Sequence, residues 1–190
     1  VPEAKAENFS KLGTTFLVKR FDRIDDQRIH FSSAMTMLGK TDGASAADGS
    51  SYLEIASFLK ANGGTPKKDL IELWKRIVFS MAVSNTDDHF RNHGFLLTNN
   101  GWELSPLYDV NPDIYGEYLS LNVNKNESSI DFDLALRSAR YYGVNESEAS
   151  AFISTIKNTV KNNWESLAKK YRISRNEIIR MAPAFQICNN

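Results

Sequence analysis

An amphipathic segment between Pro66 and Val83 constrains the fold of this chain more than any other part of the sequence. Its apolar residues recur at intervals of three and four positions, the spacing that places side chains on one face of an α-helix. They are Leu70, Leu73, Trp74, Ile77, Val78 and Met81. Thr65 can cap the free amides at the start, and Pro66 is tolerated at the first helical position. We expect this helix to be the central scaffold of the fold.

Charge and composition limit the functions that the chain can perform. Lysine plus arginine and aspartate plus glutamate each number 23, so no net basic field draws the whole protein onto nucleic acid or an anionic membrane. A nucleic-acid role would need a local patch, and we expect none. The single cysteine, Cys188, excludes an intramolecular disulfide and metal sites built on paired cysteines. The 190 residues, 42% of them hydrophobic, can bury one core, which predicts one globular domain.

Nothing in the sequence indicates a membrane or secretory destination. No uninterrupted apolar run approaches the roughly 18 residues of a membrane span. The first residues, Val1-Pro-Glu-Ala-Lys5, lack the hydrophobic core of a signal peptide. We therefore expect a soluble, cytoplasmic protein.

The N-terminal part is expected to alternate single elements with polar connections. Residues 14–21 are dense in β-branched and aromatic side chains and predict a strand, which either pairs within a small sheet or belongs to a sheet whose other strands precede Val1. Residues 31–38 indicate a short helix. The small polar residues 40–51 predict a mobile loop, and residues 52–61 predict a helix.

The rest of the chain predicts one hairpin followed by helices. Apolar residues 94–98 and 102–105 flank Asn99-Asn100-Gly101, whose residues tolerate positive φ, so a β-hairpin is expected. The expected helices are one capped by Asp131 and ended by Gly143, a long amphipathic one over residues 145–171, and a final one that opens with Ser174-x-x-Glu177. The fold class is thus expected to be mainly α with a small β-hairpin.

The segment from Ser84 to His93 carries the most chemistry. It packs nine polar or ionisable side chains directly after an apolar helix and directly before an apolar strand. Because core elements anchor both ends of such a loop, its side chains can be held in fixed positions. A catalytic site requires side chains that are held in fixed positions.

The spacing within and after this loop indicates phosphoryl transfer, which needs a carboxylate near the acceptor hydroxyl and oxygen ligands for the magnesium that bridges the ATP phosphates. Asp87-x-x-x-x-Asn92 supplies the carboxylate and an amide oxygen at the spacing of a protein-kinase catalytic loop. Asp109 follows the hairpin, where kinases place a metal-binding aspartate. Alternatively, these residues only cap turns and satisfy local amides; the order loop, hairpin, aspartate favours the kinase interpretation.

Three neighbouring residues leave alternatives open. Asp88 is as acidic as Asp87, and spacing assigns the catalytic role to Asp87 with Asp88 as a helper or a solvated neighbour. His89 either donates to a phosphate oxygen, holds Asp87 in place, or ties the loop structurally. Arg91 either pairs with the transferred phosphate or braces Asp87, and the brace is the favoured interpretation.

At this point the sequence resembles the HipA-like serine/threonine kinases, the toxin components of bacterial toxin–antitoxin pairs. Four segments carry the resemblance, and the last two hold its most specific motifs, Asn-Thr-Asp-Asp-His-x-x-Asn and Pro-Leu-Tyr-Asp. The segments are Phe16–Arg23, Arg28–Gly39, Asn85–Gly94 and Ser105–Val110. The resemblance implies a protein serine or threonine as acceptor, ATP and Mg²⁺ as cofactors, and a DNA-binding antitoxin as partner.

The resemblance also assigns residues. Asp87 would be the catalytic aspartate, Asn92 and Asp109 would bind magnesium, and His89 would lie near the nucleotide. Lys19 and Phe21 would lie at the hinge that receives adenine through backbone groups. Lys19 differs from the acidic residue that we associate with that place in the family, and the strand could equally be ordinary core.

A complete kinase also needs a phosphate-covering loop and a lysine that grips the α- and β-phosphates. Neither is recognisable before the hinge, where Lys5 and Lys11 lie in a polar stretch. We therefore expect residues 1–22 to be a residual strand and hinge, and residues 23–190 to be a helical kinase-like C-terminal lobe. The N-terminal lobe would belong to a longer chain or to another chain, and this lobe alone would hold ATP poorly.

Two other classes of function are compatible with these residues. His89-x-x-x-His93 places two imidazoles one turn apart if that segment is helical, so with Asp87 or Asp88 they could form a metal-dependent hydrolase site. That interpretation gives Asp109 no role. The second alternative is a non-catalytic kinase-like module that docks a partner.

Overall fold

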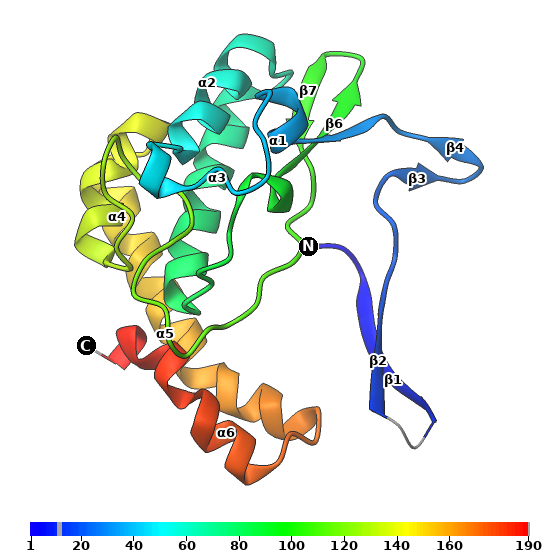
Figure 1. Ribbon diagram of the computed structural model, residues 1–190, viewed down its shortest axis with the longest axis vertical. Helices are drawn as coiled ribbons and strands as arrows, with labels where there is room; N and C mark the ends of the chain where they lie inside the picture. Colours follow the sequence, from blue (N-terminus) through cyan, green and yellow to red (C-terminus); the bar gives the residue numbers. More distant parts are fainter. Residues whose placement is uncertain (11–12, 190) are drawn as a thin grey trace.

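The computed structural model describes residues 1–10 and 13–189, and it combines a helical body with short strands (Figure 1). The strands are β1 (Ala4–Ser10), β2 (Gly13–Val18), β3 (Arg23–Ile24), β4 (Gln27–Arg28), β5 (Phe31–Ser33), β6 (Gly94–Thr98) and β7 (Gly101–Leu104). The α-helices are α1 (Ala34–Met37), α2 (Tyr52–Asn62), α3 (Pro66–Ala82), α4 (Phe132–Ser138), α5 (Glu146–Lys170) and α6 (Arg175–Met181). Short 3-10 helices are η1 (Ala46–Asp48), η2 (Phe90–Asn92), η3 (Ala139–Tyr142) and η4 (Ala182–Asn189).

Helix α3 is the scaffold that its apolar periodicity predicted. It lies in the middle of the helical body, between α2 and α4–α5 (Figure 1). Its side chains Leu73, Trp74 and Ile77 are fully buried, so their apolar surface is removed from water. The Trp74 indole donates a hydrogen bond of 3.0 Å to the carbonyl of Ala135, which fixes α3 to α4.

Several predicted helix ends are confirmed by their capping bonds. The Asn145 side chain accepts from the amide of Glu148 at the start of α5, and Ser174 and Glu177 form a reciprocal capping box at the start of α6. Gly143, with φ of 75°, ends the predicted 131–143 helix, which consists of α4 followed by η3. None of the helices within residues 1–10 and 13–189 is both long enough and apolar enough to cross a membrane.

The expected helix over residues 31–38 is wrong in its first half. Phe31, Ser32 and Ser33 form strand β5, which pairs antiparallel with β6, and only residues 34–37 are helical. The predicted hairpin of β6 and β7 thereby becomes a three-stranded sheet. Gly94 allows this pairing, because a Cβ there would lie 2.2 Å from a ring carbon of Phe31.

The strand predicted over residues 14–21 has a partner in the polar stretch before it. Strand β2 ends at Val18 and pairs antiparallel with β1, so Lys19 and Phe21 lie beyond the strand. The hairpin of β1 and β2 stands away from the helical body (Figure 1). Among its described residues, Phe9 and Phe16 are exposed. Lys11, considered in the sequence analysis, lies outside the described residues.

The polar segment 40–51 is more tightly held than its composition indicated. It contains η1, and the amide of Ala46 donates a hydrogen bond of 2.7 Å to the carbonyl of Ser120. Lys40 forms an ion pair of 2.7 Å with Glu54 on α2. The segment is therefore anchored between α2 and the chain around Ser120, and the expectation of a free loop is corrected.

Candidate active site

The polar loop begins where α3 ends. Ser84 adopts a φ of 50°, which turns the chain out of the helical path, and the amide of Asn85 donates back to the carbonyl of Ser80 over 2.8 Å. The two adjacent aspartates then face in opposite directions. The Asp87 side chain is 80% exposed, whereas that of Asp88 is 3% exposed. The sequence could not separate these two carboxylates, and the structure does.

Asp88 anchors the loop to the interior. Its carboxylate accepts hydrogen bonds from the Tyr52 hydroxyl at 2.7 Å and the Ser80 hydroxyl at 3.2 Å, and it lies 3.0 Å from Nε2 of the fully buried His93. Burial opposes ionisation of Asp88, but the charge of His93 and the three polar contacts outweigh it, so the pKa of Asp88 falls below its ordinary value. Asp88 is thus a buried structural anion, and the prediction of a solvated neighbour is wrong.

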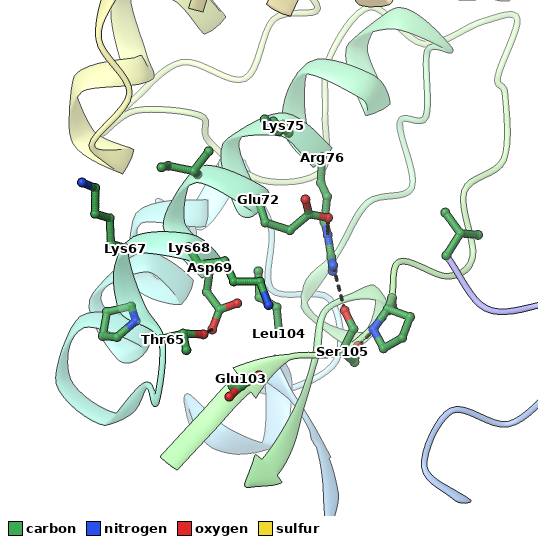
Figure 2. Close-up of a pocket in the computed structure, with 14 residues that line it drawn as sticks. Thr65, Lys67, Lys68, Asp69, Glu72, Lys75, Arg76, Glu103, Leu104 and Ser105 are labelled. Atoms are coloured by element: carbon green, nitrogen blue, oxygen red, sulfur yellow. Dashed lines mark hydrogen bonds and ion pairs between the residues drawn. The ribbon is translucent and has the colours of Figure 1, made fainter. Parts of the chain in front are cut away.

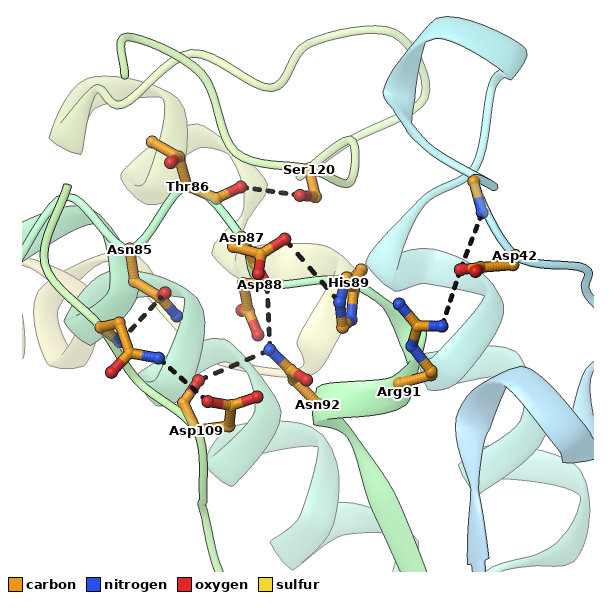
Figure 3. A network of polar contacts seen from close by, with 12 residues as sticks. Asp42, Asn85, Thr86, Asp87, Asp88, His89, Arg91, Asn92, Asp109 and Ser120 are labelled. Atoms are coloured by element: carbon orange, nitrogen blue, oxygen red, sulfur yellow. Dashed lines mark hydrogen bonds and ion pairs between the residues drawn. The ribbon is translucent and has the colours of Figure 1, made fainter. Parts of the chain in front are cut away.

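Asn92 joins the loop to the segment that carries Asp109 (Figure 3). Its Nδ2 donates to the backbone carbonyls of Asp87 at 2.9 Å and Asp109 at 3.5 Å. Because both hydrogen bonds use the amide nitrogen, Oδ1 is left without a protein hydrogen bond among the described residues. The structure therefore brings Asp87, Asn92 and Asp109 together, as the spacing predicted.

Asp109 has a backbone conformation that few types of residue adopt readily. Its φ of 55° lies in the left-handed region, which aspartate tolerates better than most non-glycine residues. The side chain is exposed, and its Oδ1 accepts a hydrogen bond of 2.9 Å from Asn111 Nδ2. This turn presents the Asp109 carboxylate beside the Asn92 amide.

A buried arginine supports the segment that leads to Asp109. Arg76 on α3 donates from Nη2 to the carbonyl of Ser105 over 2.7 Å and from Nε to Glu72 over 2.9 Å (Figure 2). Charge-assisted hydrogen bonds of this length are among the stronger polar contacts in proteins. They tie the residue that follows β7 to the central helix, four positions before Asp109.

The chain after Asp109 folds back onto the loop through side chains that the sequence analysis did not single out. The Asn111 amide donates to Asn85 Oδ1 over 3.3 Å, and the Thr86 hydroxyl donates to Asp113 Oδ2 over 2.7 Å. Gly116 packs against Thr86, where a Cβ would lie 2.0 Å from its methyl carbon. These contacts hold the backbone immediately before Asp87. Their only sequence signal is the turn-forming composition of residues 111–116, which does not reveal the partners.

His89 lies beside Asp87, and Arg91 does not. His89 Nε2 is 3.7 Å from Asp87 Oδ1, an ion-pair distance longer than a hydrogen bond. Arg91 Nη1 instead pairs with Asp42 Oδ1 at 2.7 Å, so the predicted brace between Arg91 and Asp87 is wrong. The guanidinium holds the 40–51 segment against the loop (Figure 3).

Lys19 and Phe21, the two residues predicted to lie at the hinge, take different positions. The Phe21 ring stacks on Tyr108 at a centroid distance of 5.9 Å and packs against Phe31 at 5.7 Å, so it contacts the residue directly before Asp109. Lys19 is exposed and lies 3.7 Å from Glu3 in an ion pair at the open end of the β1–β2 hairpin. The structure therefore connects Phe21 to the site, and it gives Lys19 no contact with the loop.

The family of the chain follows from comparison with known sequences. The family described as HipA-like C-terminal domain matches residues 1–164. This chain belongs to that family. The resemblance seen in the loop and in the Pro-Leu-Tyr-Asp segment is confirmed.

Curated relatives and a solved structure agree with the HipA-like assignment. "Putative kinase Y4mE" of Sinorhizobium fredii is 31% identical over 116 residues, covering 56% of this chain and 27% of that protein. "Putative kinase" of Haemophilus influenzae is 31% identical over 101 residues, covering 50% and 29%. The matches thus span less than a third of either relative.

The solved structure is that of a Shewanella oneidensis MR-1 toxin–antitoxin complex of HipA, HipB and operator DNA. HipA covers 99% of this chain with a TM-score of 0.79 and 17% identity, and the match spans 51% of the HipA chain. At this identity the match shows a shared fold.

The donor set of this HipA-like domain fits magnesium better than zinc. Mg²⁺ is usually held by one or two protein oxygens together with substrate phosphates, and Asn92 Oδ1 and the Asp109 carboxylate offer those oxygens. Within residues 1–10 and 13–189, no cluster of three His, Cys, Asp or Glu side chains is arranged to hold a metal. His93 is enclosed with Asp88, and a 3-10 turn separates it from His89. The hydrolase alternative therefore loses its second histidine.

A further carboxylate, Asp22, forms ion pairs with the arginines on either side of it. Arg20 Nη2 and Arg23 Nη1 each lie 2.6 Å from Asp22 Oδ2. The hydrogen bond from Arg20 is the largest cause that lowers the Asp22 pKa to about 2. Asp22 thereby connects Arg20 and Arg23, which precede and follow Phe21 in the chain.

Titration of Asp22 tests this clamp. Because the pKa in the folded protein lies below the ordinary value, the clamp stabilises the protein above about pH 4 and is lost as the pH falls toward 2. Carboxyl ¹³C NMR of the protein should show a midpoint near 2 for Asp22, raised in Arg20→Gln. A midpoint near the model-peptide value in the wild type would contradict the clamp.

Proposed function

We propose that this HipA-like domain is the catalytic, kinase-like C-terminal lobe of a protein kinase that transfers the γ-phosphate of ATP to a serine or threonine hydroxyl of a protein. The observation that carries the proposal is the bridge from Asn92 Nδ2 to the Asp87 and Asp109 carbonyls. It leaves the Asn92 amide oxygen without a protein hydrogen bond among the described residues, close to the exposed carboxylates of Asp109 and Asp87. The naming of both curated relatives as kinases supports the same reaction class.

Each residue has a separate task in this proposal. The Asp87 carboxylate accepts a hydrogen bond from the acceptor hydroxyl and orients it toward the γ-phosphate. It takes the hydroxyl proton as the new oxygen–phosphorus bond forms, while the bond from the γ-phosphorus to the β,γ-bridging oxygen breaks and ADP leaves. His89, 3.7 Å from Asp87, lies on the nucleotide side and donates to a phosphate oxygen. Asn92 Oδ1 and the Asp109 carboxylate would hold Mg²⁺. When bound, that ion neutralises charge on the phosphates.

The nucleotide would enter between this lobe and a part of the protein beyond it. We propose that residues 1–22 form a strand and hinge and that residues 23–190 form the lobe, with the backbone near Phe21 receiving the adenine. The Phe21–Tyr108 stack supports this position, because it links the hinge to the Asp109 segment. Lys19 points elsewhere, so only its backbone would take part. By analogy with the HipA–HipB complex, a DNA-binding antitoxin is the proposed partner.

Calorimetry with the full-length protein tests the metal site. Asp109→Ala is expected to weaken the binding of ATP in the presence of magnesium by about 1.5–3 kcal/mol, the value of a charge-assisted contact, and to leave magnesium-free binding unchanged. Asp42→Ala is the matched control, since it also removes an exposed loop carboxylate but lies against Arg91. Equal magnesium dependence in the wild type and Asp109→Ala would refute the ligand assignment.

A further inference from the structure

The peptide group that precedes Asp87 is held by a side chain from a distant segment, that of Ser120. The Ser120 hydroxyl donates a hydrogen bond of 2.7 Å to the backbone carbonyl of Thr86 (Figure 3). Ser120 lies between Leu119 and Leu121, which are 2% and 0% exposed. The hydroxyl is thus carried by a stretch of backbone that two core residues anchor.

This hydrogen bond restricts the backbone that carries the Asp87 carboxylate. The Thr86 carbonyl and the Asp87 amide belong to one planar peptide group, so a donor that fixes the carbonyl oxygen also fixes the plane from which Asp87 begins. The next peptide group is held as well, because Asn92 Nδ2 donates to the Asp87 carbonyl over 2.9 Å. Side-chain donors therefore hold the peptide groups on both sides of Asp87.

The Asp87 side chain itself is weakly restrained. It is 80% exposed, and its ion-pair contact with His89 Nε2 spans 3.7 Å, beyond hydrogen-bond distance. The direction of the carboxylate is consequently set by the backbone and by the rotamers that this backbone allows. A rotation of the preceding peptide group would turn the carboxylate away from the acceptor hydroxyl.

Ser120 is in turn held against the 40–51 segment. Its carbonyl accepts a hydrogen bond of 2.7 Å from the amide of Ala46, and Asn122 Nδ2 donates to the Ala46 carbonyl over 3.1 Å. Asn122 is 3% exposed, and its amide donates to the Ser50 carbonyl over 3.0 Å. These bonds fix the place of the Ser120 hydroxyl before any substrate binds, as the support of a catalytic group requires.

We propose that Ser120 is a positioning residue for the phosphate transfer: its hydroxyl fixes the peptide group between Thr86 and Asp87 and so orients the Asp87 carboxylate toward the acceptor hydroxyl. The inference rests on the proposed kinase function and adds a residue to it. Ser120 lies 34 positions from Thr86 and outside the four segments that carry the family resemblance. Local spacing in the sequence therefore does not identify it.

Steady-state kinetics of the full-length protein tests this role, with ³²P transfer from ATP to dephosphorylated casein as the readout. Ser120→Ala should lower kcat about 10- to 100-fold, the effect of a small misplacement of a catalytic group, and leave the KM for ATP unchanged. The loop should stay folded in the variant, because the Thr86 hydroxyl keeps its hydrogen bond of 2.7 Å to Asp113. A wild-type kcat in Ser120→Ala would overturn the proposal.

Two further variants separate the hydroxyl of Ser120 from a general effect of substitution. Ser120→Thr keeps a hydroxyl at this position and should restore most of kcat. Ser166→Ala is the matched control, because it removes an exposed hydroxyl that donates to the Asn163 carbonyl over 2.8 Å on α5, and it should retain full activity. An equal loss of kcat in Ser166→Ala would contradict a specific role for Ser120.

A double-mutant cycle shows whether Ser120 acts through Asp87. Adding Ser120→Ala to Asp87→Asn should change the residual kcat by less than about twofold, because the carboxylate that Ser120 orients is already gone. A hydrogen bond that only supports the fold would reduce kcat by the same factor in both backgrounds. That outcome would refute the positioning role.

Hydrogen exchange followed by mass spectrometry tests the contact without catalysis. Ser120→Ala should speed amide exchange about three- to tenfold in a peptide that covers residues 85–92, the effect of losing one hydrogen bond, and leave exchange in α5 unchanged. Wild-type exchange in residues 85–92, or faster exchange along the whole chain, would overturn the proposal. If the local effect is present but the wild type transfers no phosphate to casein or to any other protein, the ordering role of Ser120 stands and the kinase proposal fails.

Discussion

Asp87→Asn is expected to reduce phosphate transfer by the full-length protein by about 10²–10⁴-fold, the usual contribution of a positioned acid or base. Asparagine preserves the size of the side chain and the backbone carbonyl that Asn92 holds at 2.9 Å. It cannot take the proton of the acceptor hydroxyl. Because the side chain is 80% exposed and lies 3.7 Å from His89 Nε2, beyond hydrogen-bond distance, stability and ATP affinity should remain unchanged.

Initial rates of ³²P transfer measure this effect, with ATP binding followed in parallel by calorimetry. Asp133→Asn on α4 is the matched control, because it makes the same change at another exposed aspartate and should retain full activity. Transfer at the wild-type rate in Asp87→Asn would refute the base assignment. A wild-type protein that binds ATP and magnesium but transfers nothing would favour the non-catalytic module.

Local sequence patterns predicted the elements whose contacts are themselves local. The stripe from Leu70 to Met81, the cap at Asn145 and the capping box at Ser174 depend on residues within one or two turns, and α3, α5 and α6 formed where these patterns indicated. Strands β1 and β5 were missed because their pairing depends on distant or polar partners. Three residues from Phe31 carry no readable periodicity, and only Gly94, far along the chain, makes their pairing possible.

In the candidate site, too, the sequence predicted the local contacts and missed the distant ones. The spacing of Asp87 and Asn92 predicted that both would be held by one loop, and the hairpin predicted the return of the chain at Asp109. The sequence could not show that Arg91 turns to Asp42 or that Thr86 is held by Asp113, because these partners are separated by about 50 and by 27 positions. Such pairs are set by how the segments pack in three dimensions.

The opposite orientations of the two adjacent aspartates give the second large expected effect. Asp88→Ala should lower the free energy of unfolding by about 3–5 kcal/mol, the cost of removing one partner from a buried ion pair. The change removes the carboxylate to which Tyr52 and Ser80 donate and that lies 3.0 Å from His93 Nε2. Asp87→Ala, one position earlier and largely exposed, should change the free energy of unfolding by no more than about 0.5 kcal/mol.

Urea unfolding of the two variants and the wild type measures this difference, and its pH dependence has a fixed sign. The pKa of Asp88 is lowered in the folded protein, so its stabilisation is present above the ordinary aspartate pKa and is lost as the pH falls through the folded value. Asp88→Ala should lack this part of the acid sensitivity, whereas Asp87→Ala should keep it. Equal destabilisation by both substitutions would show that the loop register is wrong. Asp88 would then be a candidate for the reactive carboxylate, because the structural role of Asp88 and the catalytic role of Asp87 are assigned from their difference in burial.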